Sequence, residues 1–383
     1  MRMWLTPSRT QLSLLLIIPI LLLPVVVQPS QASAVKPTIW FSLNQEYPDA
    51  VFTDVTFLNA THGWIAGQWT EGMSGNGVVL HTVDGGDTWI TQLKSGREQM
   101  YRQIDILSAD SVWVTSWGGL LHTSDDGQTW EEYPVVDGTT LMSTVEFINE
   151  THGWTATEYT LYNTTDGGET WGVVSGWSFH DVPKHMQFVS SSKVWAIGFS
   201  GIYYSNDCAA TWVEVHDSGG WAVSMKDDGE GWAVADSLLM YTSNGTSWEE
   251  LTVPGAAPMF RLREPYLSDI VFIGDHGWVV GDETPVMHTA DYGNTWYKQS
   301  VPDSVTRRLT AVHFLNQTLG WAVGYSGAII KTTTGDSLGT PFYDVFLPIV
   351  LIPSGFLLVI CSIVIIHRKM RKIDSTQSAA DLE

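Results

Sequence analysis

Cysteine and basic side chains are scarce in this 383-residue sequence. It has 2 Cys, and 19 Lys and Arg stand against 41 Asp and Glu, which gives a formal net charge of −22. Two cysteines exclude a disulfide-rich scaffold and a zinc site built from cysteines. A strongly acidic chain also argues against nucleic acid as a partner, because that affinity depends on Lys and Arg neutralising phosphates.

Tryptophan and glycine, in contrast, are abundant, with 19 Trp and 35 Gly. The hydrophobic fraction of 44% is ordinary for a folded protein. The length suits one large or two ordinary domains.

The N-terminal segment 1–34 has the features of a secretory signal peptide. Arg2 and Arg9 precede the short apolar run 14–23, and Ala32-Ser33-Ala34 offers a cleavage site of small residues. We therefore expect the mature protein to begin at Val35, outside the cytoplasm.

The C-terminal segment 345–366 carries no charge over 22 residues and is followed at once by basic residues. A helix of this length can cross a bilayer, and a basic flank favours the cytoplasmic side. The sequence thus predicts a single-pass cell-membrane protein, with a short stalk at 337–344, a transmembrane helix at 345–366 and a cytoplasmic tail at 367–383.

The region between these ends is built from a repeated eight-residue motif. It first reads Thr-Val-Asp-Gly-Gly-Asp-Thr-Trp at 82–89 and recurs, with variations, five more times. Its acidic position is occupied by Asp84, Asp125, Asp166, Asp207 and Asp291, with Asn244 in the fifth copy.

A second motif, a Trp usually preceded by Gly, lies about 17 residues before each copy of the first. It occurs at Trp64, Trp113, Trp154, Trp195, Trp232, Trp278 and Trp321. The resulting period of about 41 residues fits four short strands and their turns, which is one propeller blade. We predict an all-β, seven-bladed β-propeller over 35–336.

These motifs resemble a known family. The pattern Ser/Thr-x-Asp-x-Gly-x-Thr-Trp is similar to the Asp-box (BNR repeat), and the adjoining Gly-Trp strands resemble the photosystem II stability/assembly factor propellers. The resemblance implies a role in escorting or assembling membrane protein complexes. It implies nothing about catalysis, because Asp-box propellers host unrelated activities.

The Asp-box itself is expected to be structural. Its Asp can accept backbone N–H bonds across a tight turn, and its Gly supplies a conformation that other residues resist. The last box is incomplete at 332–336, and the segment around Trp40 resembles the missing piece. We expect that segment to add the outer strand of the seventh blade and close the ring.

Some aromatic and basic residues fall outside the repeat. If strands run A to D from axis to rim, these residues lie in or near B–C turns and D–A connections, which share one face, called here the top face. Aromatic and arginine side chains are typical of binding surfaces, although each could instead pack loops together. The expected binding residues are Trp69, Trp117, Tyr159, Trp177, Phe199, Trp221, Tyr325, Arg102, Arg263 and Arg308.

The Asn-x-Thr sequons fall on the opposite, bottom face, in A–B and C–D turns. In a secreted chain they are glycosylation candidates. They are Asn59, Asn149, Asn163, Asn244 and Asn316. In a host without this modification, the preference of turns for Asn explains them.

Catalysis is not expected. The segment 260–265, Phe-Arg-Leu-Arg-Glu-Pro, is only faintly similar to a sialidase motif, and carboxylates such as Asp105 and Asp269 recur at first-strand positions, as structural residues do. No cofactor or metal is expected, since the histidines follow the repeat.

The sequence therefore favours a membrane-anchored scaffold that binds a membrane or cell-surface protein through its top face. The alternative is a carbohydrate-binding or glycoside-hydrolysing, sialidase-like propeller. A surface-coat component without a specific ligand is a third possibility.

Overall fold

The computed structural model describes residues 39–43, 47–71, 74–136, 140–226, 229–235, 238–251, 267–282, 286–305, 307–338 and 340–341. Within these residues no helix is long and apolar enough to span a bilayer. The predicted signal peptide, transmembrane helix and cytoplasmic tail lie outside the described residues.

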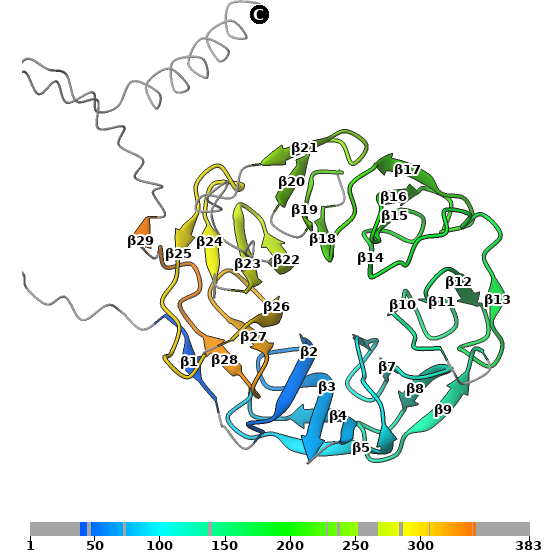
Figure 1. Ribbon diagram of the computed structural model, residues 1–383, viewed down its shortest axis with the longest axis horizontal. Helices are drawn as coiled ribbons and strands as arrows, with labels where there is room; N and C mark the ends of the chain where they lie inside the picture. Colours follow the sequence, from blue (N-terminus) through cyan, green and yellow to red (C-terminus); the bar gives the residue numbers. More distant parts are fainter. Residues whose placement is uncertain are drawn as a thin grey trace, which may run out of the picture.

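Seven antiparallel sheets form a ring, which confirms the predicted seven-bladed propeller (Figure 1). Blade 1 is β2 (Ala50–Phe57), β3 (Gly63–Glu71), β4 (Ser74–Thr82) and β5 (Ile90–Glu98). Blade 2 is β6 (Ile104–Ile106), β7 (Val112–Thr115), β8 (Gly119–Thr123) and β9 (Glu131–Pro134). Blade 3 is β10 (Thr144–Phe147), β11 (Gly153–Ala156), β12 (Leu161–Thr164) and β13 (Gly172–Val173).

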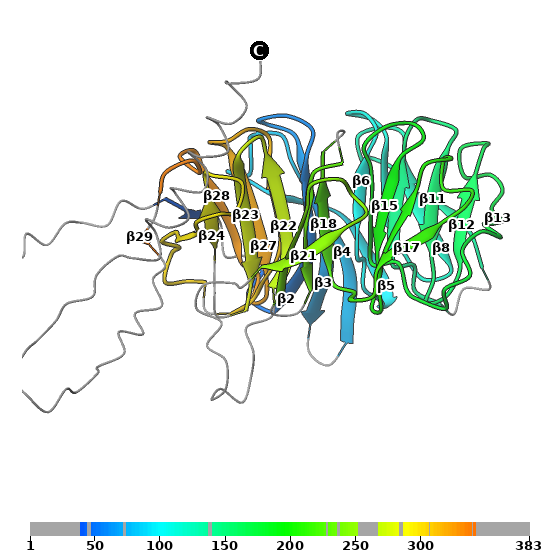
Figure 2. The same ribbon diagram turned by 90° about the horizontal axis from the view of Figure 1, so that it is seen from above.

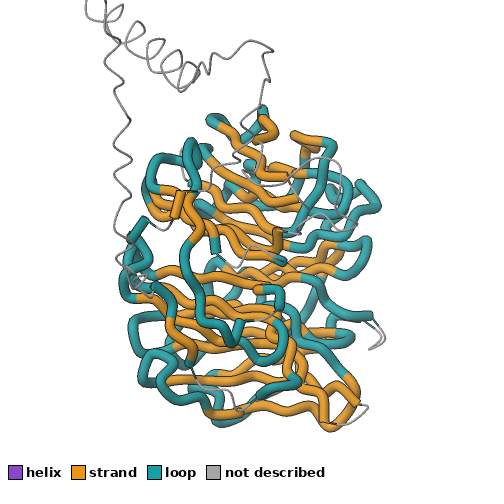
Figure 3. The backbone as a smooth tube through the Cα atoms, turned by 60° about the vertical axis from the view of Figure 1, so that its left-hand side comes forward, coloured by secondary structure: helices purple, strands orange, loops and turns teal. Residues whose placement is uncertain are grey.

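The remaining blades follow the same order from axis to rim. Blade 4 is β14 (His185–Phe188), β15 (Val194–Ile197), β16 (Ile202–Ser205) and β17 (Val213–His216). Blade 5 is β18 (Ala222–Met225), β19 (Gly231–Ala235), β20 (Leu238–Thr242) and β21 (Trp248–Leu251). Blade 6 begins with β22 (Leu267–Ile273), β23 (His276–Gly281), β24 (Met287–Thr289) and β25 (Tyr297–Lys298), and blade 7 with β26 (Leu309–Phe314), β27 (Gly320–Gly324) and β28 (Ile329–Thr332). Seen from its edge, the ring is a disc (Figure 2), and strands make up most of each blade (Figure 3).

The two chain ends complete the outer edges of the last two blades. β1 (Phe41–Ser42) pairs with β28, so the N-terminal segment adds the outer strand of blade 7, as the sequence predicts. β29 (Thr340–Pro341) pairs with β25 and gives blade 6 a fifth strand. The segment 337–344 is expected from the sequence to be a stalk, and its residues 340–341 pair along the outer wall of blade 6.

The buried Trp of each second strand joins one blade to the next. Trp232 stacks on Phe272 with ring centroids 3.6 Å apart, and Trp321 stacks on Phe57 at 3.5 Å, which closes the ring between blades 7 and 1. The Gly before the Trp is required by the same packing. A Cβ at Gly63 would lie 2.5 Å from the ring of Phe57, its partner in the register of blade 1.

The Asp-box forms one hydrogen-bonded turn that recurs around the bottom face. In blade 1, Asp84 Oδ1 accepts from the backbone N–H of Thr88, and Asp84 Oδ2 accepts from its hydroxyl. Thr82 Oγ1 in turn donates to Asp84 and accepts from the N–H of Gly86. The same bonds are made by the Asp residues of the other four boxes, Asp125, Asp166, Asp207 and Asp291.

Four of the five sequon asparagines have structural roles in turns on the same face, whereas Asn163, expected in a C–D turn, lies in a strand. Asn59, Asn149 and Asn316 each accept the backbone N–H of the Thr two positions later. Asn244 accepts the N–H groups of Thr246 and Ser247 in place of a box Asp, and Asn163 lies within β12. The preference of such turns for Asn accounts for four of these five positions, and their glycosylation stays a prediction.

Candidate functional site

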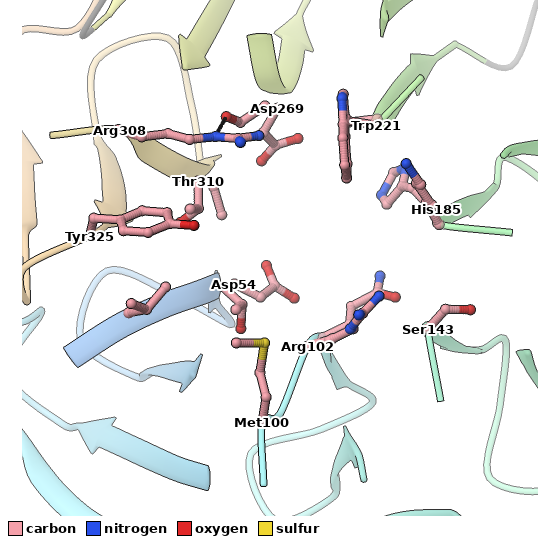
Figure 4. A pocket seen from close by; sticks show the side chains of 17 residues that line it. Asp54, Met100, Arg102, Ser143, His185, Trp221, Asp269, Arg308, Thr310 and Tyr325 are labelled. Carbon is pink, nitrogen blue, oxygen red and sulfur yellow. Dashed lines mark hydrogen bonds between the residues drawn. The ribbon is translucent and has the colours of Figure 1, made fainter. Parts of the chain in front are cut away.

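A cavity of about 410 Å³ opens at the top end of the central channel (Figure 4). Every blade contributes to its wall, mainly through the residue that precedes or begins its innermost strand. The polar and aromatic lining consists of Thr53, Asp54, Arg102, Gln103, Ser143, Lys184, His185, Trp221, Ser268, Asp269, Arg308, Thr310 and Tyr325. We call this cavity the funnel.

Three β-bulges shape the funnel wall in blades 1, 6 and 7. The register between the first and second strands shifts at Thr53, Ser268 and Thr310. Each of these is one extra residue in the first strand, without a partner in the second. A bulge bends the strand and redirects a side chain. All three of these residues line the funnel.

A cation–aromatic cluster occupies one side of the funnel. Lys184 Nζ lies 3.3 Å from the ring centroid of Trp221 and 3.1 Å from that of Phe199. The guanidinium of Arg308 lies 5.6 Å from the Trp221 ring and donates a hydrogen bond from Nε to Ser268 Oγ at 2.6 Å. Trp221 is thus flanked by two cations, an arrangement in which the ring faces attract positive charge.

Arg102 and Tyr325 complete the polar rim. Figure 4 shows Arg102 and Arg308 entering the cavity from different blades, with Tyr325 beside Thr310. The backbone N–H of Arg102 is fixed by Thr115 Oγ1 at 2.9 Å, and its side chain is exposed. Three basic side chains therefore converge on one cavity of a chain with a net charge of −22.

Carboxylates lie in and around the channel, but each connects neighbouring blades. Asp54 Oδ2 accepts the N–H of Ile104, Asp105 Oδ2 that of Phe147, and Asp269 Oδ2 that of Val312. Gln187 and Ser224 accept the N–H groups of Met225 and Phe272, and Thr310 Oγ1 donates to Phe52 O. Side chains of the innermost strands thus bind the next blade around the ring.

Burial of these carboxyl groups changes their pKa values. Desolvation raises the pKa of Asp54 to about 6 and those of Asp105 and Asp269 to about 7, against the opposing effect of their backbone hydrogen bonds. Burial also raises the pKa of Glu146 well above its usual value, with the nearby charge of Asp105 adding to it. The carboxylates that the sequence singles out thus have a structural task.

The predicted top-face residues divide into four groups, of which the first three follow here. Arg102, Trp221, Arg308 and Tyr325 meet in the funnel, and Phe199 joins them through Lys184. Trp117 and Tyr159 are exposed at the top of blades 2 and 3, outside the funnel lining. Arg263 lies outside the described residues.

The two other aromatic residues pack against the propeller. Trp177 is 7% exposed and contacts Tyr203 and Trp212 in the core, which corrects the expectation that it belongs to a binding surface. Trp69 is half-buried, 5.2 Å from the Tyr47 ring, with Lys94 above it at 4.5 Å.

Lys184 and His185 were missed by sequence reasoning. A signal for Lys184 exists, because Lys184, Trp221 and Arg308 each stand immediately before the innermost strand of their blade. Aligning the repeats at that position would have placed the three side chains together.

No metal site is evident in the part of the chain that the structure describes, where no three potential ligands cluster. Instead, His122 stacks on Trp113 at 4.0 Å and His81 on Trp64 at 4.3 Å. Cys208 is a free, half-buried cysteine in the turn of the fourth box.

Comparisons with known proteins agree with this architecture. The family model described as photosynthesis system II assembly factor YCF48 matches residues 32–141 and 242–338. Over 79 residues the chain is 32% identical to the chloroplastic photosystem II stability/assembly factor HCF136 of Oryza sativa subsp. japonica; this match covers 18% of the chain and 19% of the rice protein.

Solved structures show the same fold at low identity. YCF48 bound to D1 peptide has a TM-score of 0.62 at 19% identity, covering 78% of this chain and 97% of that one. YCF48 from Cyanidioschyzon merolae has a TM-score of 0.59 at 18% identity, covering 79% and 100%. A GH74 xyloglucanase from Xanthomonas campestris has a TM-score of 0.58 at 12% identity, covering 80% of this chain and about half (55%) of the enzyme.

Proposed function

Because the chain belongs to the family of photosynthesis system II assembly factor YCF48, we propose that it is a scaffold that binds a segment of a membrane protein in its funnel. The observation that carries this proposal is the cluster of Lys184, Trp221 and Arg308, with Arg102 nearby. Arginine and tryptophan dominate the energetics of protein interfaces. A relative in this family has been solved with a peptide bound.

The chemistry of the funnel favours a peptide with acidic and apolar side chains. The three cations offer partners for carboxylates, and Trp221 offers an apolar surface between them. The cavity of about 410 Å³ is large enough for a few side chains rather than for a folded domain. An extended segment or a chain end is therefore the fitting ligand.

We also propose that the protein is anchored in the cell membrane with its propeller outside. The support is the sequence alone: the apolar segment 345–366, its basic flank at 367–372 and the signal-like segment 1–34. Anchoring would confine the propeller to the membrane that holds its partners and raise their effective concentration.

In-cell photocrosslinking tests the binding site. A benzoylphenylalanine at Tyr325 of the full-length protein should crosslink to a partner in host membranes, and mass spectrometry should identify the same partner segment reproducibly. Adding Trp221→Ala or Arg308→Ala should reduce the crosslink by about tenfold or more, since an interface hot spot is worth 2 kcal/mol or more.

Trp117→Ala is the matched control, because Trp117 is 43% exposed on the same face but does not line the funnel. It should leave the crosslink intact. Equal crosslinking in all variants would contradict funnel binding.

Glycan binding is the second candidate, favoured by the fold shared with the GH74 xyloglucanase and by the exposed rings of Trp117 and Tyr159. Flat aromatic rings on a surface suit sugar stacking. A glycan panel that includes xyloglucan oligosaccharides separates the candidates. Binding lost with Trp117→Ala and kept with Arg308→Ala would favour the glycan.

A further inference from the structure

The chain remains attached to the propeller up to Pro341. The N–H of Gly335 donates to Thr318 O at 2.9 Å. The amide Nε2 of Gln299, which is fully buried, donates to Gly335 O at 2.6 Å and to Ser337 O at 2.9 Å. β29 then pairs along β25, with Pro341 opposite Tyr297.

This attachment leaves a very short tether. Tyr297 follows the box turn of blade 6, so Pro341 lies toward the bottom edge of that blade's outer wall. Only residues 342–344 separate Pro341 from the apolar segment 345–366. Three extended residues span at most about 10 Å. If 345–366 crosses a bilayer, the bottom edge of blade 6 must lie next to it.

Exposed apolar side chains gather in the same sector. Leu58 (37% exposed) and Val83 (52%) lie in bottom turns of blade 1, and Tyr292 (46%) lies in the box turn of blade 6. Phe41 (48%) is on β1 at the edge of blade 7, and Leu338 (53%) precedes β29.

The bottom turns of blades 2 to 5 have no counterpart among the described residues. The other exposed large apolar side chains lie in top-face loops or, as Ile90, Val173 and Val213, at the start of the outer strands of blades 1, 3 and 4, which places them toward the bottom edge of the outer wall but outside the bottom turns. Among the described residues, the bottom turns that expose large apolar side chains are therefore those of blades 1 and 6, on either side of blade 7.

We propose that the bottom rim of blades 6, 7 and 1 is a lipid-contacting surface that rests on the bilayer. This inference depends on the membrane anchoring proposed above. Tyr and Phe side chains favour the interface between water and lipid, and the smaller aliphatic groups gain from shallow burial there. The funnel opens on the opposite face of the disc and so points away from this membrane.

Site-specific fluorescence tests the orientation in the full-length protein. In a background with Cys208→Gly and Cys361→Ala, single cysteines are placed at Leu338, Val83, Val213 and Tyr159 and labelled with an environment-sensitive dye. The protein is reconstituted into phosphatidylcholine vesicles that contain lipids with nitroxide-labelled headgroups. Dyes at Leu338 and Val83 should shift to the blue and be quenched. The dye at Tyr159, on the top face, should show neither effect, and the dye at Val213, toward the bottom edge of blade 4 across the ring, should be quenched less than those at Leu338 and Val83.

A longer tether provides a matched control. A ten-residue Gly/Ser insertion between Asp344 and Val345 keeps the anchor but should weaken quenching at Leu338 and Val83. Equal quenching at all four positions, or at none, in protein that resists carbonate extraction would overturn the orientation while leaving the anchor intact. Release of the protein by carbonate would instead overturn the anchor, and the orientation with it.

Discussion

The two faces of the propeller differ in how far they follow the repeat. On the bottom face, five box turns make the same hydrogen bonds with the same residue types. On the top face, one equivalent position holds Lys184, Trp221 and Arg308 in three different blades. Residues that recur from blade to blade stabilise the blades, whereas residues that vary at an equivalent position give the top face a local chemistry of its own.

The sharpest test of this contrast compares the loss of a buried residue that recurs in the repeat with the loss of a residue that varies between blades. Trp232→Ala removes a fully buried ring that stacks on Phe272, so we expect a loss of about 3–5 kcal/mol in the free energy of unfolding. Trp221→Ala, at the half-buried rim, should cost much less. Urea denaturation followed by circular dichroism measures both, and similar losses would remove the distinction.

Closure of the ring is expected to be the next most sensitive feature. Gln299→Ala removes the acceptor of the Trp40 indole N–H and the donor to two carbonyl groups. Leaving buried polar groups without partners should cost about 2–3 kcal/mol. Gln128→Ala, at an exposed position, is the control and should stay within about 0.5 kcal/mol. A Gln299 variant as stable as this control would mean that the contacts of Gln299 with Trp40 and with the C-terminal segment do not limit stability.

The channel carboxylates should make stability depend on pH. The pKa of Asp269 is raised to about 7 in the folded protein, so the folded state retains a proton that the unfolded state loses above about pH 4. Stability from this group is therefore highest in acid and falls as the pH rises through 7. Asp269→Asn cannot titrate, and its stability relative to the native protein should rise by about 2 kcal/mol between pH 5 and 8. Thermal denaturation at both pH values measures this difference, and a constant difference would contradict it.

Loss of a single Asp-box aspartate should have the smallest effect on the free energy of unfolding. Burial would raise the pKa of Asp84, but hydrogen bonds from Thr88 and Thr82 outweigh it and lower the pKa to about 2. Asp84→Ala should cost roughly 1 kcal/mol, the net value of a typical hydrogen bond, because the turn is largely solvated. Asp87→Ala, whose exposed carboxylate accepts no bond within the box, should cost less by the same denaturation assay. A larger loss with Asp87→Ala would mean that the turn is not held by the box aspartate.

The periodic features could be predicted from sequence because each depends on a residue type that recurs at a fixed spacing and suits one local geometry. The Asp-box turns, the Gly-Trp packing and the seventh-blade position of Trp40 are of this kind. The funnel was predicted in part, since Arg102, Trp221, Arg308 and Tyr325 meet there.

What was missed depends on contacts that local sequence does not encode. Trp177 lies in a connection but is buried by Tyr203 and Trp212, both from the following blade. β29 pairs through backbone groups alone, which any short extended segment could provide. The β-bulges at Thr53, Ser268 and Thr310 are visible only when two strands are placed in register.

The hydrogen bond between Trp40 and Gln299 has a consequence for folding during synthesis. Trp40 is made among the first residues of the propeller, yet its hydrogen-bond partner Gln299 lies 259 positions later. The ring therefore cannot close until nearly the whole propeller has been synthesised. Contacts so distant in sequence form slowly. During that interval β1 has no partner strand and is open to pairing with another chain, so folding of this chain should depend on helpers that shield unfinished sheets.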